Sequence, residues 1–155
     1  MPDLNIVLFE PEIPQNTGNI ARTCACVGAR LHLVEPMGFR LTDKHLGRAG
    51  LDYWDQIEIN RYSCVEQYME KMQGKEQYFF TGQAKKSMSE PKFGEEVYLI
   101  FGRESRGIDP VILEKHKTQC VRIPMREGLR SLNVSNAVAI GAYEVLRAWS
   151  YPGLT

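Results

Sequence analysis

Glycines and small polar residues follow two apolar runs in the last third of the chain. The run 97–101 leads into residues 102–107, Gly-Arg-Glu-Ser-Arg-Gly, and the run 121–123 leads toward residues 131–136, Ser-Leu-Asn-Val-Ser-Asn. Such residues let a ligand approach backbone donors and acceptors closely. If both runs are parallel strands, the two segments meet at the carboxyl edge of one sheet and form a small-molecule site there. Neither segment has the spacing GxxxxGK(S/T) or GxGxxG, which disfavours an ordinary nucleotide-binding fold.

A third group of polar residues lies near the amino terminus, at the expected start of a helix. Asn16 or Thr17 would cap this helix, and Asn19 and Arg22 share a face because they are three residues apart. Backbone N–H groups at the helix end, with a guanidinium one turn further on, would bind an anion or a ribose phosphate. Ordinary capping, with Arg22 in solvent, explains the same residues equally well.

The two later segments differ in how strongly they indicate a function. Gly102 would let a ligand approach the main chain, and Glu104 could accept hydrogen bonds from a ribose or from neighbouring backbone. A plain turn explains residues 102–107 slightly better. Residues 131–136 hold four polar side chains where capping needs one or two, so a functional role is favoured there. The charged turn 126–130 could bring arginines to a phosphate backbone.

The elements that must position these groups alternate between strand and helix. Strands are expected at 4–9, 31–34, 56–59, 77–81, 97–101 and 121–123. Helices are expected from Asn16 or Thr17 to a C-terminal Gly28, and at 65–72, 110–116 and 133–149. A short polar helix or loop is expected at 41–50, and a polar, mobile loop at 85–94. This alternation predicts an α/β fold with a parallel sheet, and a single domain spanning 1–155.

Composition limits the function classes. The chain has 155 residues, 43% hydrophobic and 25% charged, with a net charge of +0. A uniformly basic surface is excluded, so any nucleic-acid contact needs a local patch such as Lys85-Lys86 or the basic stretch 40–48. The four cysteines lack CxxC spacing, which favours a reducing cytoplasm. No apolar run approaches the ~20 residues that cross a bilayer, so no membrane partner is expected.

Other sources of chemistry have little support. The histidines, His32, His45 and His116, are scattered and lack metal-ligand spacing, so no metal is expected. His32, in a strand, is expected to be a satisfied and partly buried histidine. Ser131 has no histidine near it in the sequence, which disfavours a hydrolase triad.

Taken together, these segments resemble the SPOUT superfamily of RNA methyltransferases. The resemblance is closest to its small single-domain branch, the tRNA (cytidine/uridine-34) 2′-O-methyltransferases. It covers nearly the whole chain through residues 5–20, 35–39, 48–53, Phe-Gly-x-Glu at 101–104 and Ile-Pro-Met…Ser-Leu-Asn-x-Ser-Asn within 123–136. The extra RNA-binding domain of larger relatives has no counterpart here. The turn 126–130 departs from the branch by its higher charge, which leaves the substrate contacts there open.

The resemblance implies a Rossmann-like SPOUT fold whose C-terminal segments form a trefoil knot. It further implies that S-adenosylmethionine binds in the knot, mainly through backbone groups. The matching cofactor positions are Phe80, Thr81, Gly102, Ile123, Ser131 and Leu132. Arg22 matches the residue assigned to activate the 2′-hydroxyl, and the residues that would shape the pocket are Asn16, Glu104, Ser131 and Asn133. Since a guanidinium is hardly ever deprotonated, a base and a phosphate-binding role both stay open for Arg22.

The resemblance also implies a homodimer through the last helix, with RNA bound across both subunits. The apolar stripe of that helix, from Val134 to Trp149, fits this interface, and burial within one subunit is the alternative. We therefore expect 2′-O-methylation of the wobble nucleotide 34 in tRNA, with leucine isoacceptors as substrates. A 2′-O-methyltransferase acting on another tRNA or rRNA nucleotide, and a non-catalytic RNA-binding dimer, are the alternatives.

Overall fold

The computed structural model describes residues 1–41 and 54–155. The strands are β1 (Asp3–Phe9), β2 (Arg30–Val34), β3 (Ile59–Tyr62), β4 (Glu76–Phe80), β5 (Glu96–Phe101) and β6 (Cys120–Val121). The helices are α1 (Pro14–Val27), α3 (Val65–Lys71), α4 (Pro110–Lys115) and α5 (Val134–Ala148), with 3-10 helices at Trp54–Gln56 and Lys117–Gln119. Apart from Leu41, the polar segment expected at 41–50 and the family-like residues 48–53 lie outside the described residues.

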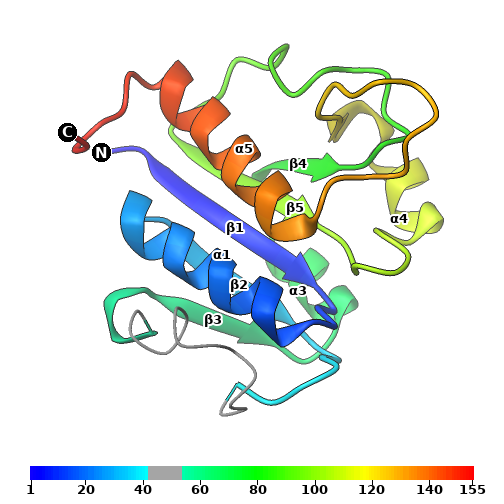
Figure 1. Ribbon diagram of the computed structural model, residues 1–155, viewed down its shortest axis with the longest axis horizontal. Helices are drawn as coiled ribbons and strands as arrows, with labels where there is room; N and C mark the ends of the chain where they lie inside the picture. The colour runs from blue at the N-terminus through cyan, green and yellow to red at the C-terminus, as the bar shows by residue number, and fades with distance from the viewer. Residues whose placement is uncertain (42–53) are drawn as a thin grey trace.

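The strands form one parallel sheet in the order β3-β2-β1-β5-β4-β6. In its middle, Ile6 of β1 lies beside Leu31 of β2 and Leu99 of β5. Parallel neighbours need crossover connections, which are usually helical. Figure 1 shows α1 and α5 side by side in front of the sheet. The arrangement confirms the predicted α/β class and parallel sheet, whereas the threading of the C-terminal segments into a knot stays a prediction.

The sheet separates two apolar cores. Successive side chains of a strand point to opposite faces, so neighbouring residues of β1 enter different cores. Ile6 belongs to the core that contains Ile20 of α1 and Val138 of α5. Val7 belongs to the other core, together with Tyr68 of α3. Because both faces are covered, the central strands are mostly apolar on both faces, as expected for a parallel sheet, with Asn5 of β1 and His32 of β2 as buried polar residues.

Helix α1 begins earlier than predicted. Its first residue is Pro14 and its N-cap is Ile13, so neither Asn16 nor Thr17 is the cap. Proline suits the first turn because the N–H group it lacks would have no partner within the helix. The other end is as predicted, with Gly28 in the left-handed region at a φ of 75°. Asn16 therefore lies inside the first turn, with its side chain available to other elements.

The third strand also differs from its prediction. It spans Ile59–Tyr62 instead of 56–59, and Gln56 ends a 3-10 helix. Its register is fixed by pairing with β2, where Val34 lies beside Tyr62. That register buries the Tyr62 ring in the core, which a strand at 56–59 would have left outside the sheet.

Two segments near the other end of the sheet match the predictions more closely. β6 ends at Val121, two residues before the predicted end. The segment 85–94 is a loop, as predicted, with one bridge between Ser87 and Arg122. Backbone hydrogen bonds from Met88 N–H to the Arg122 carbonyl (2.8 Å) and from Arg122 N–H to the Lys86 carbonyl (2.9 Å) tie this loop to the chain after β6.

The apolar stripe of α5 packs within its own subunit. Val138 and Val145 are buried in the core, and Gly141 lies against the Phe80 ring. A Cβ at Gly141 would be 2.9 Å from Phe80 Cζ, so the glycine permits the close packing of α5 on β4. The interpretation of this stripe as a dimer interface is therefore wrong, because its side chains already have partners in the same chain.

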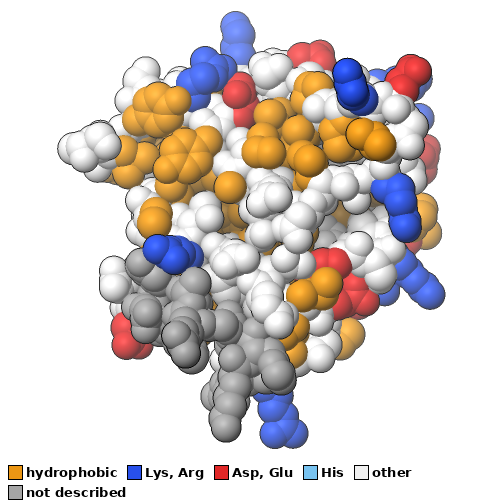
Figure 2. Space-filling model, in the orientation of Figure 1, with side chains coloured by type: hydrophobic (Ala, Val, Ile, Leu, Met, Phe, Trp, Pro, Cys, Tyr) orange, Lys and Arg blue, Asp and Glu red, His pale blue; other side chains and the backbone are white. Residues whose placement is uncertain are grey.

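The outer face of α5 carries a different apolar surface. Ile140 is 38% exposed and Tyr143 48% exposed. Figure 2 shows hydrophobic side chains gathered over this helix on the face of the molecule turned to the viewer. No helix in the described ranges is long and apolar enough to cross a membrane.

Candidate functional site

A cavity of about 950 Å³ opens at the carboxyl ends of β4 and β5. Its walls come from the strand ends, the turn that follows β5, and the chain that leads into α5. All the positions expected to bind a cofactor line it: Phe80, Thr81, Gly102, Ile123, Ser131 and Leu132. The lining combines apolar side chains with backbone polar groups, which is typical of small-molecule sites.

Three polar residues from distant parts of the chain are hydrogen-bonded beside this cavity. The Glu104 carboxylate accepts from the backbone N–H groups of Glu12 (2.9 Å) and Ile13 (2.8 Å), and from Asn16 Nδ2 (3.2 Å). Asn16 Oδ1 in turn accepts from Asn133 Nδ2 at 3.1 Å. We refer to Asn16, Glu104 and Asn133 as the cavity cluster. It connects the start of α1, the turn after β5 and the start of α5.

Each member of the cavity cluster has a defined place in the local structure. Asn133 caps α5, its Oδ1 accepting from the backbone N–H of Ser135 at 2.9 Å. Glu104 supplies the negative charge that the N-terminal end of α1 favours. The anion expected at this helix end is thus a carboxylate of the protein itself. The expected acceptance of backbone hydrogen bonds by Glu104 is confirmed.

A second carboxylate fixes the turn after β5 from the opposite direction. Glu12 accepts from the backbone N–H of Ser105 at 2.9 Å and from its hydroxyl at 2.8 and 3.0 Å. The Ser105 N–H, and next its hydroxyl, lower the pKa of the Glu12 carboxyl. Within the turn, Gly107 N–H donates to the Arg103 carbonyl at 2.8 Å. Sequence reasoning missed Glu12 and Ser105, because nothing local links residues this far apart.

Gly102 has a structural purpose in the turn that follows β5. A Cβ at this position would lie 2.2 Å from the carbonyl carbon of Gly107 and 2.3 Å from the nitrogen of Ile108. No side chain fits there, because the turn folds back onto Gly102. The turn itself therefore requires a glycine here, and a ligand's approach to the main chain of Gly102, which lines the cavity, stays a prediction.

Among the expected catalytic residues, Arg22 is the one that does not line the cavity in the described ranges. It is exposed on α1 together with Asn19, as their spacing predicted. Asn16, Glu104, Ser131 and Asn133 line the cavity, but within the described ranges the lining does not include Arg22. The same lining contains Arg103, Arg106 and Arg130, of which only Arg130 belongs to the turn that the sequence indicated as a phosphate contact.

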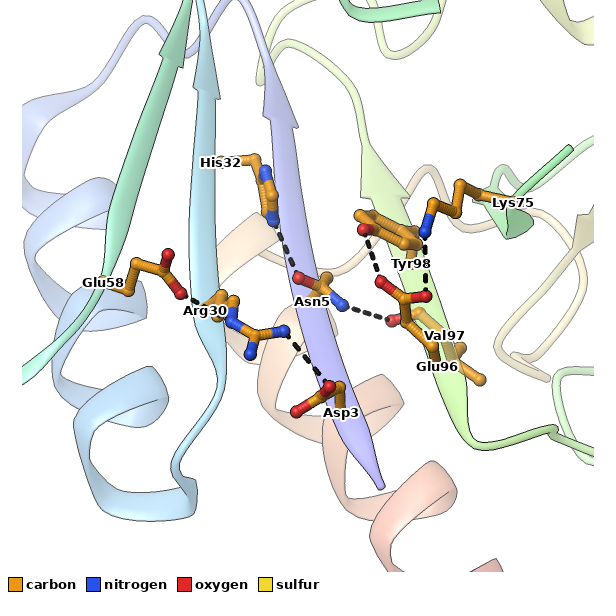
Figure 3. Close-up of polar contacts among 9 residues, drawn as sticks. All are labelled: Asp3, Asn5, Arg30, His32, Glu58, Lys75, Glu96, Val97 and Tyr98. Atoms are coloured by element: carbon orange, nitrogen blue, oxygen red, sulfur yellow. Dashed lines mark hydrogen bonds and ion pairs between the residues drawn. The ribbon is translucent and has the colours of Figure 1, made fainter. Parts of the chain in front are cut away.

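A second polar group is buried in the sheet and joins β1, β2 and β3; Figure 3 shows its members Asn5 and His32. His32 Nε2 is 2.8 Å from Asn5 Oδ1, and His32 Nδ1 is 2.8 Å from the Tyr62 hydroxyl. We refer to Asn5, His32 and Tyr62 as the inner network. His32 is only 4% exposed, and its burial lowers the pKa of the imidazole to about 4. The expectation of a satisfied histidine is confirmed.

Charged residues surround the inner network at the amino edge of the sheet. Arg30 forms ion pairs with Asp3 and Glu58, as Figure 3 shows for this edge. Lys75 bonds to Glu96 at 3.0 Å. In the described ranges, no group of three or more His, Cys, Asp or Glu side chains could hold a metal ion.

Known proteins resemble this chain along nearly its full length. A model of the SpoU rRNA Methylase family matches residues 3–143. The tRNA (cytidine(34)-2'-O)-methyltransferase of Escherichia coli K12 is 44% identical over 151 residues, covering 97% of this chain and 96% of that protein. The protein of the same name from Saccharophagus degradans is 44% identical over 150 residues, covering 96% and 97%. A solved structure described as giving insights into the 2-OH methylation of C/U34 on tRNA superposes with a TM-score of 0.90 at 40% identity, covering 96% of this chain and 97% of that one.

Proposed function

Because the chain belongs to the SpoU rRNA methylase family, we propose that it methylates the ribose 2′-hydroxyl of nucleotide 34 in tRNA. The observation that carries this proposal is the cavity at the carboxyl edge, which gathers every expected cofactor position and the cavity cluster in one place. The choice of nucleotide follows the E. coli and S. degradans relatives, whose names specify cytidine 34. Leucine isoacceptors stay our expected substrates.

The methyl donor in this proposal is S-adenosylmethionine, which supplies a methyl group already activated on a sulfonium. The cavity fits such a ligand in size and in chemistry, since drug-sized ligands bind in pockets of roughly 300–1,000 Å³. Phe80 and Phe101, stacked with ring centroids 4.6 Å apart, offer an apolar wall. Backbone groups around Thr81, Gly102 and Leu132 offer hydrogen bonds on other sides.

The protein's own contribution is to hold the acceptor oxygen in line with the methyl carbon. A C–O bond forms while the C–S bond breaks, its electron pair stays on sulfur, and the hydroxyl proton leaves to water. Correct positioning supplies much of the acceleration of such a reaction. The cavity cluster fixes the cavity walls, and Arg22 binds the phosphate beside the acceptor ribose and orients its 2′-oxygen. We assign Arg22 this role because a guanidinium is a very weak base.

We also propose that the enzyme acts as a homodimer through the outer face of α5. Ile140 and Tyr143 are exposed there, and a second copy would cover them. Arg22 lies outside the cavity lining of its own subunit within the described ranges, so it would serve the cavity of the other subunit. A C-terminal trefoil knot, one domain over 1–155 and a cytoplasmic location complete the proposal.

The test is methylation of tRNA by the purified protein, followed by mass spectrometry of nuclease digests. We expect a 2′-O-methyl group at nucleotide 34 of leucine tRNAs, and loss of this mark in a deletion strain. A mark at another nucleotide would favour the alternative target. Calorimetry with S-adenosylhomocysteine provides the control, since failure to bind it would favour a non-catalytic RNA-binding dimer.

A further inference from the structure

The cavity wall carries more positive than negative charge. The whole chain has a net charge of +0, but the lining in the described ranges includes Arg103, Arg106 and Arg130 against one carboxylate, Glu104. The Glu12 carboxylate, outside the lining, interacts with Arg103 and Arg106, and the balance is still positive when it is included. Glu104 already accepts its hydrogen bonds from backbone and amide donors of the α1 region. Arg106 and Arg130 are exposed, and they reach the cavity from two different segments.

This excess charge does not match the proposed methyl donor. S-adenosylmethionine carries a sulfonium, an ammonium and a carboxylate, so its net charge is positive and additional cations do not attract it. RNA carries a negative charge on every phosphate, and neutralising phosphates with arginine is the main source of its affinity for proteins. The excess charge therefore matches the acceptor substrate.

Hydrogen bonds fix the backbone of the turn that carries Arg106, and Arg130 lies three residues before the cap of α5. The turn that carries Arg106 is closed by two hydrogen bonds between Arg103 and Gly107 (2.8 and 3.2 Å), and Glu12 holds Ser105 at its tip. Arg130 precedes a segment anchored by the hydrogen bond from Asn133 to Asn16. A preorganised backbone lowers the entropy lost on binding, which favours specific contacts over a diffuse basic surface.

We infer that Arg106 and Arg130 bind backbone phosphates of the tRNA next to the acceptor nucleotide and so position its ribose at the cavity. The inference rests on the proposed function and names the side chains that hold the substrate at that site. Guanidinium groups suit this role, because their planar donors can bind a phosphate through two hydrogen bonds.

The experiment compares Arg106→Ala and Arg130→Ala with a matched control, Arg61→Ala. Arg61 is an exposed arginine of β3, outside the cavity lining of the described residues and outside the charged turn 126–130. We expect KM for tRNA to rise about tenfold in each test variant, while kcat changes little. The slope of log K for tRNA binding against log salt should fall by about 0.7 for each lost phosphate contact. Arg61→Ala should change neither quantity, and Arg106→Lys should have a KM between those of Arg106→Ala and the wild type.

The affinity for S-adenosylhomocysteine separates this inference from its rival. It should stay within about twofold of the wild type in both test variants, as expected for groups that contact only the RNA. A large loss of this affinity would assign the arginines to the carboxylate of the donor and overturn the inference, as would unchanged KM and salt slope. If the wild type methylates no tRNA, the proposed function is wrong, but the phosphate contacts can still be tested by RNA binding. A reduced salt slope of RNA binding in the variants would still support the phosphate contacts.

Discussion

The cavity cluster and the inner network use similar side chains on the same sheet, yet they have opposite characters. Both contain an asparagine, and both connect residues from separate strands or loops through hydrogen bonds of about 3 Å. In the inner network, Asn5 is 0% exposed and both ring nitrogens of His32 have partners. In the cavity cluster, Asn133 is exposed and all three residues line an open cavity.

The difference shows that polarity alone does not identify a functional site. A buried polar group has to be satisfied within the protein, and the inner network achieves this with protein atoms alone. The cavity cluster is also hydrogen-bonded, but its bonds fix walls around space that a ligand can enter. We infer that the inner network stabilises the fold and that the cavity cluster serves the reaction. Each prediction below tests one side of this contrast.

The largest effect is expected at Arg22, which the proposed function places in the cavity of the other subunit. Arg22→Ala should lower kcat about 10³-fold while the affinity for S-adenosylhomocysteine survives. In a dimer of Arg22→Ala with Glu104→Ala, one cavity has an intact Glu104 and receives an intact Arg22 from the other subunit. Half of the dimers in an equal mixture are of this kind, and each has one intact site of two, so mixing should restore about a quarter of the wild-type activity. Each variant alone is the control. Loss of both methylation and cofactor binding, or no restoration on mixing, would contradict the assignment.

Glu104 tests the cavity cluster directly. Glu104→Ala removes the acceptor of three hydrogen bonds and leaves the N–H groups of Glu12 and Ile13 without their partner. We expect kcat/KM to fall about 100-fold, equivalent to about 3 kcal/mol, because the α1 start and the cavity wall lose their alignment. Glu104→Gln, which keeps the shape and one acceptor oxygen, should lose less. Steady-state kinetics with tRNA measures both, and equal activity of Glu104→Ala and wild type would remove the cavity cluster from the reaction.

The elements were largely predictable because their signals are local. β5 (Glu96–Phe101) is apolar on both faces, as a central parallel strand must be, and Gly28 ends α1 in the conformation that glycine favours. The third strand was misplaced because short apolar runs carry no register. Its position at Ile59–Tyr62 depends on pairing with β2 and on the burial of Tyr62, which are tertiary effects.

The sequence indicated most of the polar residues that line the cavity, but it did not predict how they are arranged. The cofactor positions came from a family resemblance, and the structure gathers them around one cavity. The hydrogen bonds that define the cavity cluster join residues 88 to 117 positions apart, such as Asn16 with Glu104 and Asn133. Spacing rules describe neighbours within a turn or two of a helix, so they assigned Asn16 to local capping. Only the fold shows that its partners are distant.

The inner network predicts a loss of stability in mild acid. The unfolded chain protonates His32 below about pH 6.5, whereas the folded protein does so only near pH 4, because burial disfavours the imidazolium. The free energy of unfolding should therefore fall between these values, by about 3 kcal/mol at 1.36 kcal/mol per pH unit. Urea denaturation from pH 7 to 4 measures this loss, and His32→Gln should lack it. A His32 imidazole that titrates near pH 6.5 by NMR would contradict the burial of the inner network.

Glu12 affects stability in a more acidic range. Its pKa is lowered in the folded protein, so its contribution to the free energy of unfolding is lost only as the pH falls below the ordinary carboxyl pKa of 4.5.

The smallest effect is expected at Gly141 of α5, which packs against two aromatic rings of the cavity wall. A Cβ there would lie 2.9 Å from Phe80 Cζ and 3.4 Å from Phe101 Cζ, and both rings line the cavity. Gly141→Ala gains about 1 kcal/mol of helix propensity, which offsets part of the 1–3 kcal/mol cost of overpacking. We therefore expect Tm to fall by a few degrees at most. The affinity for S-adenosylhomocysteine should be several-fold weaker, because the added methyl group displaces the Phe80 ring, which lines the cavity.

Gly82→Ala is the matched control for Gly141→Ala. It adds the same methyl group at the cavity, where no atom lies within 4 Å. We expect its affinity in calorimetry to equal that of the wild type. If Gly141→Ala also keeps wild-type affinity, the Phe80 ring does not form the part of the wall that contacts the ligand. In that case the apolar wall formed by Phe80 beside α5 stabilises the fold, as the inner network does. The ligand site then consists of the cavity cluster and the backbone around it.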